Sequence, residues 1–254
     1  MLERLAKAVS KRLWYIRDYV DYKRSEQKRF YKLMSDLQKK IQPDDKLLII
    51  GNGPSVKRTD FEKYKGFKVV TMNRAYVKWQ DLGLQDVFFH VCINDLVISE
   101  FKEDLGNLPC PTLLNFKASQ RSGMTPRKNI AYLLMGFFVG DRVINSLSSP
   151  LSSGGTVTFV ALNLGLLLGF KRIVLVGVDH NFHNVGPANK TVTQQGDDRN
   201  HFFENYFPSG MQWELPDLDR SERGFQLIKE SAERLGVVIT DETVAGNLQV
   251  FEKA

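Results

Sequence analysis

The sequence is poor in cysteine and has no long apolar run. Its two cysteines, Cys92 and Cys110, form no CxxC pair, so we exclude a disulfide framework and expect a reducing compartment, the cytoplasm. The longest uncharged stretch, 143–170, is mostly apolar only over 157–170. That length is too short to cross a bilayer and predicts a buried helix. The basic N-terminus also lacks the apolar run and the small-residue cleavage site of a secretory signal.

The composition carries no strong bias either. Of the 254 residues, 43% are hydrophobic and 25% are charged, which is close to the globular average and excludes disordered, collagen-like and coiled-coil proteins. A chain of this length buries most of its apolar surface in a core of its own. We therefore expect one large domain, or one domain with an appendage.

Positive charge is concentrated in residues 1–42, which hold 12 Lys and Arg against 5 Asp and Glu, whereas the remaining residues hold 23 against 24. Apolar residues recur there at spacings of three and four in two runs, namely Leu2, Leu5, Val9, Leu13, Ile16 and Val20, then Phe30, Met34, Leu37 and Ile41. This pattern predicts two amphipathic helices or one long interrupted helix.

Two interpretations of this extension stay open. Its Lys and Arg residues, with Trp14 and Tyr15 on the apolar face, suit a helix that lies on an anionic membrane surface. Alternatively, the helices dock on their own domain or on a partner chain. Nucleic acid is not an expected partner, because the rest of the chain is not basic and has no recognition module.

From residue 43 onward, short apolar runs alternate with amphipathic stretches. Strands are predicted at 46–51, 67–73, 86–95, 111–116, 171–179 and 236–240, and helices near 57–65, 75–82, 95–105, 156–169 and 219–235. This alternation predicts an α/β, Rossmann-like domain over 43–254, with a mainly parallel sheet and helices on both faces. The irregular stretch 180–218 is too long for a plain connection, and we expect a lid there. Ligands of such folds bind beyond the carboxyl ends of the strands.

A glycine-rich turn, GNGPSV, follows the first predicted strand. It matches neither the dinucleotide fingerprint nor the P-loop. Gly51 and Gly53 nevertheless let backbone amides approach a phosphate or a ribose, and Asn52 and Ser55 add hydrogen-bonding side chains. The alternative is a tight turn that needs glycine for its conformation alone.

Polar residues also follow the second and third predicted strands. Asn73 and Arg74 come after the second strand, and Asn94 and Asp95 after the third. Each pair is a candidate for ligand binding, and the simpler alternative is that Asn73 and Asp95 cap the helices that follow.

The segment SSGGTVT leads into the apolar helix expected at 156–169. Unpaired amides at a helix N-terminus form an anion site, so Ser153, Gly154, Gly155 and Thr156 are candidates for phosphate binding. Capping of the helix by Ser153 or Thr156 is the alternative.

Asp179 and His180 end the buried strand at 171–179. A carboxylate there can hold a ribose hydroxyl, position an acceptor or attack as a nucleophile. Asp179, His180 and His183 have a spacing that a metal could use, but no cysteine or further acidic cluster accompanies them, so we expect no metal. His201, in the lid, is the candidate general base, because histidine accepts a hydroxyl proton near neutral pH; a packed or surface histidine is the alternative.

The motifs GNGPS, MNRAY, SSGGTVT and GVD, in this order, resemble those of a known family over about residues 46–180. The family joins small bacterial CMP-sialic acid sialyltransferases, motility-accessory nonulosonate transferases and the archaeal 6-hydroxymethylpterin diphosphokinase-like domain. The stretch NHFFENYFPSGMQWELPDLDRSE and the final NLQVFEK are similar to a subgroup encoded among surface-polysaccharide genes.

The resemblance implies roles for individual residues. Asn52 and Asn73 match contacts to the nucleotide ribose and phosphate, Ser153 and Gly154 match the loop that contacts the cytidine nucleotide, and Asp179 matches a strand end beside the donor. The family's sialyltransferases place tyrosines soon after that acid, where this chain has His180, Asn181 and Phe182.

The expected function is that of a metal-independent glycosyltransferase, cytoplasmic or peripheral on the inner face of the cytoplasmic membrane. It would move a CMP-linked sialic, nonulosonic or Kdo-type acid to a surface-glycan acceptor without a cofactor, with His201 as the base or, in a retaining variant, Asp179 as the nucleophile. One alternative is pyrophosphoryl transfer from ATP to a pterin, with Mg²⁺ held by Asp95 and Asp179. Another is a non-catalytic nucleotide-binding partner.

Overall fold

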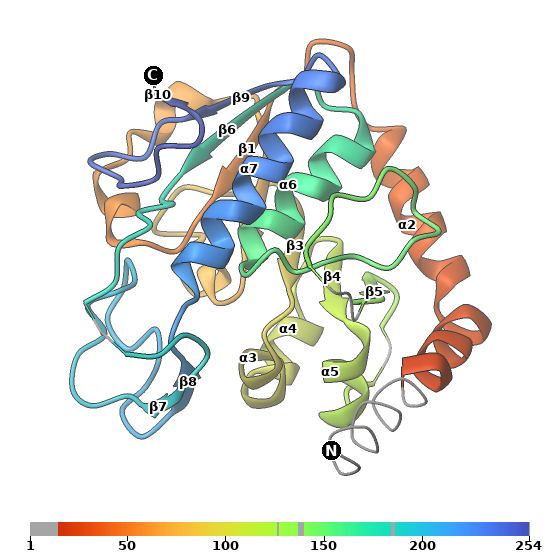
Figure 1. Cartoon of the computed structure of the whole chain (residues 1–254), viewed down its shortest axis with the longest axis horizontal. Helices are drawn as coiled ribbons and strands as arrows, with labels where there is room; N and C mark the ends of the chain where they lie inside the picture. The colour runs from red at the N-terminus through yellow and green to blue at the C-terminus, as the bar shows by residue number, and fades with distance from the viewer. Residues whose placement is uncertain (1–14, 126, 137–139, 184–185, 254) are drawn as a thin grey trace.

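The computed structural model describes residues 15–253 except 126, 137–139 and 184–185. Its centre is an eight-stranded sheet in the order β10-β9-β6-β1-β2-β3-β4-β5 (Figure 1). The strands are β1 (Leu47–Ile50), β2 (Lys68–Met72), β3 (Val87–Cys92), β4 (Thr112–Asn115), β5 (Ile130–Leu133), β6 (Arg172–Val176), β9 (Val238–Asp241) and β10 (Glu252–Lys253). Every pairing between them is parallel.

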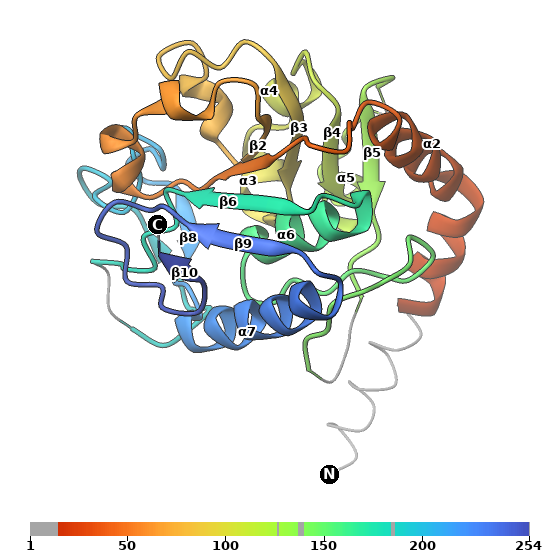
Figure 2. The same cartoon turned by 90° about the horizontal axis from the view of Figure 1, so that it is seen from above.

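Helices cover both faces of this sheet. The α-helices are α2 (Gln27–Gln38), α3 (Asp95–Glu100), α4 (Lys102–Gly106), α5 (Phe116–Arg121), α6 (Val157–Leu168) and α7 (Leu218–Arg234), and short 3₁₀ helices are η1 (Pro54–Arg58), η2 (Phe61–Tyr64) and η3 (Ala75–Lys78). α6 and α7 lie side by side on one face, and the turns after β1 and β2 lie on the other (Figure 2). The predicted Rossmann-like α/β class is therefore confirmed.

The six predicted strands are β1, β2, β3, β4, β6 and β9. The stretches near 57–65 and 75–82 form only 3₁₀ turns rather than longer helices. In the first stretch, Asp60 separates two such turns and caps the second by accepting a hydrogen bond from the Glu62 N–H. Four features were not predicted from the sequence, namely β5, β10, α5 and the hairpin of β7 (Thr191–Thr193) and β8 (Gln212–Glu214).

The order of the strands places a topological switch point beside β1. The chain runs outward from β1 through β5 on one side and then returns to β6 on the other side of β1. Connections leave β1 and β6 in opposite directions, so their carboxyl ends border a crevice, which is the usual ligand position in such sheets.

The core is built around α6 and the central strands. All four residues of β1 are buried, as are ten of the twelve residues of α6. Gly165 lets α6 approach β1 closely, because a Cβ there would lie 2.7 Å from Leu47 Cδ2. This contact fixes the N-terminus of α6 near the carboxyl edge of the sheet.

The N-terminal segment divides into two parts. Residues 15–25 are helical, and a turn at Glu26 separates them from α2. Phe30, Met34 and Leu37 of α2 are buried, and this helix packs against β5 and α6 as part of the core. The predicted positions Leu2, Leu5, Val9, Leu13 and Trp14 lie outside the described residues.

No helix in the described part of the chain is both long enough and apolar enough to span a membrane. The most apolar helix, α6, has 12 residues.

Candidate active site at the carboxyl edge of the sheet

Two adjoining cavities lie beyond the carboxyl ends of β1, β2, β3 and β6. The first has a volume of about 160 Å³ and is bordered by the glycine-rich turn, the N-terminus of α6 and the segment 180–218, for which we keep the name lid. The second, of about 510 Å³, extends from the end of β3 toward the β7–β8 hairpin. Both cavities are lined by Asn73, Gly155, Thr156, Val157, Phe182, His201 and Pro216.

Most residues expected from the sequence meet at these cavities. The lining includes Gly51, Asn52, Gly53, Asn73, Asn94, Asp95, Ser153, Gly155, Thr156, Asp179, His180 and His201. Ser55, Arg74 and Gly154 are not among the residues that line either cavity in the described part of the chain. These three residues lie behind the walls of the cavities and support the residues that line them.

The glycine-rich turn is required by close packing. Neither Gly51 nor Gly53 has a positive φ, so a left-handed conformation is not what requires glycine at these two positions. A Cβ on Gly51 would lie 2.1 Å from the Gly177 carbonyl oxygen, and a Cβ on Gly53 would lie 1.9 Å from Asp179 Oδ2. The loops after β1 and β6 therefore touch at the switch point.

Asp179 fastens the glycine-rich turn to the end of β6. Its Oδ1 accepts a hydrogen bond from the Ser55 N–H at 3.2 Å, and its Oδ2 accepts one from the Ser55 hydroxyl at 2.6 Å. Because Ser55 occupies both carboxylate oxygens, the arrangement suits a positioning role better than a nucleophilic one.

The turn after β2 is held from inside the sheet by His90. Asn73 has a left-handed φ of 51°, and its carbonyl lies 3.0 Å from His90 Nε2, which must carry the proton because a carbonyl only accepts. Nδ1 then accepts from the Thr71 hydroxyl at 2.9 Å. Burial lowers the pKa of His90 to about 3, so the ring stays neutral and keeps this arrangement.

Two buried amide oxygens face this region without partners. Oδ1 of Asn52 and Oδ1 of Asn73 make no hydrogen bond within the described residues, although both side chains line the first cavity. A buried acceptor without a partner is unfavourable by about 1–3 kcal/mol. A ligand with hydroxyl or amine donors would remove this penalty.

The N-terminus of α6 opens onto both cavities through Gly155, Thr156 and Val157. Thr156 is the N-cap, since its hydroxyl accepts a hydrogen bond from the Thr158 N–H. Both glycines before it have positive φ, and a Cβ on Gly155 would lie 2.9 Å from the backbone nitrogen of Ser221. The Thr156 N–H is bonded to the Ser153 carbonyl and the Thr158 N–H to the Thr156 hydroxyl, so the helix dipole and the remaining amides of the first turn favour an anion here.

An ion pair that the sequence analysis missed positions this loop. Arg220 of α7 donates two hydrogen bonds to Asp141, at 2.7 and 2.8 Å, and a third to Ser153 Oγ at 3.0 Å. Asp141 also accepts from the Ser152 hydroxyl and from the Gly154 N–H. The hydrogen bonds from Arg220 hold the pKa of Asp141 below its usual value, so the pair is charged at neutral pH.

The lid carries an aspartate–histidine pair. His201 Nδ1 lies 2.8 Å from Asp198 Oδ2, and an ionised carboxylate only accepts, so Nδ1 donates and Nε2 is left as the basic nitrogen. The imidazole stacks on Tyr206 with centroids 3.8 Å apart and planes 2° apart. Burial raises the pKa of Asp198, but hydrogen bonds from His201 and from the N–H groups of Asn200 and Phe207 outweigh it and lower the pKa.

Arg74 anchors the lid instead of lining the cavities. Its guanidinium donates to the carbonyls of Asn205 and Tyr206 and lies 3.8 Å above the Phe101 ring. A backbone hydrogen bond from the Phe202 N–H to the Asn52 carbonyl, at 3.0 Å, ties the lid to the glycine-rich turn as well.

We predict that Arg74→Met opens the lid. Two carbonyls would lose a charged donor, which is worth about 1.5–3 kcal/mol in hydrogen bonding, so amide hydrogen exchange across 198–213 should accelerate by about tenfold or more. Arg234→Met, which removes an arginine bonded to Ser231 on α7, is the control and should leave exchange in the lid unchanged. Equal protection in both variants would contradict the anchoring role.

Asn94 and Asp95 meet the second cavity from the end of β3. Asn94, not Asp95, caps α3, because its Oδ1 accepts from the Val97 N–H. Asp95 accepts hydrogen bonds from the Asn115 amide and from Arg121. Asn73 caps no helix through its side chain either, so the capping alternative is wrong for both Asn73 and Asp95.

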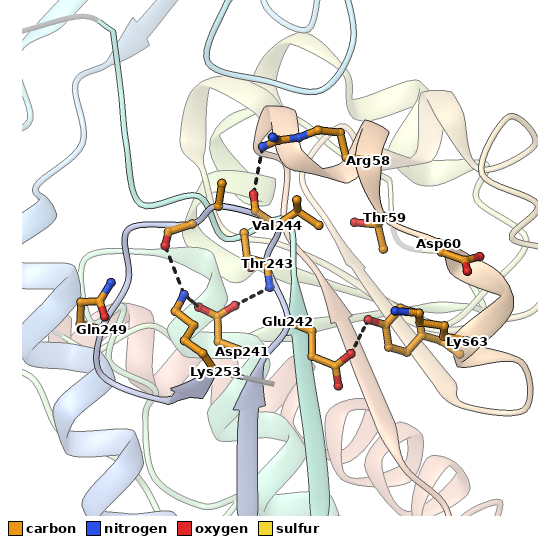
Figure 3. Close-up of a pocket in the computed structure, with 13 residues that line it drawn as sticks. Arg58, Thr59, Asp60, Lys63, Asp241, Glu242, Thr243, Val244, Gln249 and Lys253 are labelled. Atoms are coloured by element: carbon orange, nitrogen blue, oxygen red, sulfur yellow. Dashed lines mark hydrogen bonds and ion pairs between the residues drawn. The ribbon is translucent and has the colours of Figure 1, made fainter.

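A third hollow, of about 520 Å³, lies beside the end of β9 (Figure 3). Asp241 is fully buried there and accepts hydrogen bonds from Lys253 Nζ at 2.6 Å and from the Thr243 N–H at 3.0 Å. Arg58 donates to the Val244 carbonyl at 2.9 Å. These groups bind one another, so we assign the hollow to the anchoring of the C-terminal segment.

The described residues contain no group of three His, Cys, Asp or Glu side chains arranged to hold a metal ion. No known protein family matches the sequence, and no curated protein matches it. A functional assignment therefore depends on the fold and on the geometry of this site.

Proposed function

We propose that the protein is a glycosyltransferase that moves a sialic, nonulosonic or Kdo-type acid from its CMP-linked donor to a surface-glycan acceptor. The observation that carries the proposal is the place of His201. Oriented by Asp198, it lies on the wall shared by the two cavities, where a base must sit if one cavity holds a donor and the other an acceptor. The class of donor comes from the resemblance of the strand-end motifs.

The first cavity suits the nucleotide end of the donor. The N-terminus of α6 offers amides and a positive dipole end to a phosphate, and the unpaired oxygens of Asn52 and Asn73 can accept from ribose hydroxyls or a cytosine amine. The second cavity, with Phe207 and Trp213 in its wall, suits the apolar face of an acceptor sugar.

In the proposed reaction, the acceptor hydroxyl attacks the anomeric carbon while His201 Nε2 takes its proton. The bond from that carbon to the phosphate oxygen breaks, and CMP leaves with the electron pair. Asp179 keeps the donor loop in place through Ser55, so the anomeric centre is inverted without a covalent intermediate.

The alternatives are less well supported. Pyrophosphoryl transfer to a pterin would use Asp95 and Asp179 as Mg²⁺ ligands, but Asp95 binds Arg121 and Asn115 while Asp179 binds Ser55. A purely regulatory nucleotide-binding protein would not require the Asp198–His201 pair.

A lipid-carried glycan acceptor would be located at the inner face of the cytoplasmic membrane. The proposed function therefore includes peripheral binding of the protein to that face.

Thermal unfolding with CMP tests the donor site. At a concentration about a hundredfold above Kd, a ligand specific for the folded state adds about 2.7 kcal/mol, which for a chain of this size raises Tm by about 5–10 °C. We expect this shift without added metal.

Asn52→Ala should remove most of the shift yet leave the Tm of the free protein nearly unchanged, since its Oδ1 has no partner to lose. Asn107→Ala, at an exposed position of α4's C-terminal end, is the matched control and should keep the full shift. Stabilisation by ATP with Mg²⁺ and none by CMP would favour the pyrophosphoryl-transfer alternative instead.

A further inference from the structure

The helix at 15–25 turns the apolar residues of its predicted stripe toward solvent. Ile16 is 57% exposed and Val20 is 36% exposed, and they are the two described members of that stripe. They lie four residues apart and therefore share one face of the helix. A soluble domain normally buries such a face.

The opposite face of the same helix already packs against the domain. Tyr22 is buried, and its hydroxyl donates to the Tyr132 carbonyl of β5 at 3.1 Å. Asp18 pairs with Lys117 at 2.5 Å. These contacts fix the rotation of the helix, so Ile16 and Val20 cannot turn inward without breaking them.

Exposed cations accompany the apolar pair. Arg17 and Arg24 lie on the same helix, where Arg17 Nε is 3.8 Å from Asp21 Oδ2, and Lys28 is exposed beyond the turn at Glu26. All three belong to the segment that holds the excess positive charge of the whole chain. This charge disfavours a second copy of the same surface as the occupant, because two such faces repel. It favours an anionic surface.

The helix lies at the edge of the molecule that carries the proposed active site. Lys117, which binds Asp18, stands at the start of α5, directly beyond the carboxyl end of β4. In Figure 1 the helix and the β7–β8 hairpin lie toward the same side of the molecule, with α3 and α5 between them. A surface bound by this helix would therefore meet the same edge of the sheet as the two cavities.

We propose that the face formed by Ile16, Val20, Arg17, Arg24 and Lys28 binds an anionic lipid bilayer. Ile16 and Val20 insert at the boundary of headgroups and acyl chains, and the cations contact lipid phosphates. This inference names the surface that would carry the peripheral membrane binding included in the proposed function, and it does not depend on the transfer reaction.

Co-sedimentation of the full chain with vesicles tests it. We expect binding to vesicles of phosphatidylglycerol and phosphatidylcholine, and at least tenfold weaker binding to phosphatidylcholine alone. The double variant Ile16→Asp/Val20→Asp should bind the anionic vesicles at least tenfold less tightly. Arg24→Gln/Lys28→Gln should reduce binding severalfold, and added salt should weaken what remains.

The matched control is Val77→Asp/Leu235→Asp, which alters two exposed apolar residues elsewhere, 45% and 52% exposed. It should bind vesicles like the unmodified protein. The CMP-induced shift in Tm should be the same in all three double variants as in the unmodified protein, which separates failure of this proposal from failure of the proposed function.

Three results would overturn the inference. The first is unchanged vesicle binding by Ile16→Asp/Val20→Asp, and the second is equal binding to neutral and anionic vesicles. The third is that the unmodified chain forms a dimer and Ile16→Asp/Val20→Asp is a monomer, since a second copy of the chain would then occupy the face.

Discussion

His201→Ala is expected to lower kcat for sugar transfer by about 10²–10⁴-fold, the usual contribution of a positioned general base. The affinity for CMP should stay nearly unchanged, because the base acts on the acceptor proton and not on the nucleotide. Steady-state rates with donor and acceptor varied separately, together with CMP titration, would measure both effects. Activity near that of the unmodified protein would remove His201 from the mechanism.

Asp198→Asn tests the orientation of His201 while leaving the His201 imidazole in place. The amide keeps the size of the carboxylate but loses its charge, so it no longer fixes the imidazole or stabilises the imidazolium that forms. We expect kcat to fall while KM for donor and acceptor changes little. A rise in KM alone, with kcat retained, would mean that Asp198 only holds the fold of the lid.

Gly51→Ala is expected to lower the free energy of unfolding by about 3 kcal/mol or more, which exceeds the usual effect of a surface substitution. The added Cβ would meet the Gly177 carbonyl oxygen at 2.1 Å, and backbone on both sides prevents relief by a side-chain rotation. For a chain of this size, Tm should fall by about 6–12 °C.

Gly66→Ala is the matched control for this prediction. Gly66 has a φ of +85° but no neighbour within 4 Å of a Cβ, so alanine there meets only the strain of a left-handed conformation, about 1–2 kcal/mol. Equal destabilisation by the two substitutions would show that close approach of the β1 and β6 loops is not what requires glycine at position 51.

The fold was largely predictable because buried strands carry local signals. β1 and β6 are short runs of Val, Leu and Ile bounded by polar residues or glycine. β5 was missed although a turn at Lys128 and Asn129 precedes it, because its four residues run on into further apolar positions that hide the end of the strand. β10 has only two residues, both exposed, and its pairing with β9 depends on tertiary contacts alone.

The candidate site was also predictable in part from the sequence. Residues that follow a strand were found, because parallel strands bring their carboxyl ends to one edge. Asp141 and Arg220 were missed, since their partnership joins positions that are distant in the sequence. Asp198 is different: it precedes His201 by three residues, and that spacing in a lid was a signal available from the sequence.

The lid brings His201 and Asp198 to the site on one segment, and Arg74 holds that segment to the turn after β2. In the proposed reaction, a protein molecule whose lid has been released would hold the activated sugar next to bulk water. His201 would then be too far away to deprotonate a water molecule beside the sugar. Wasteful hydrolysis of the donor would then stay slow until the segment returns over both substrates. Chain connectivity alone would thus make proton removal conditional on closure, with no separate sensor for the acceptor.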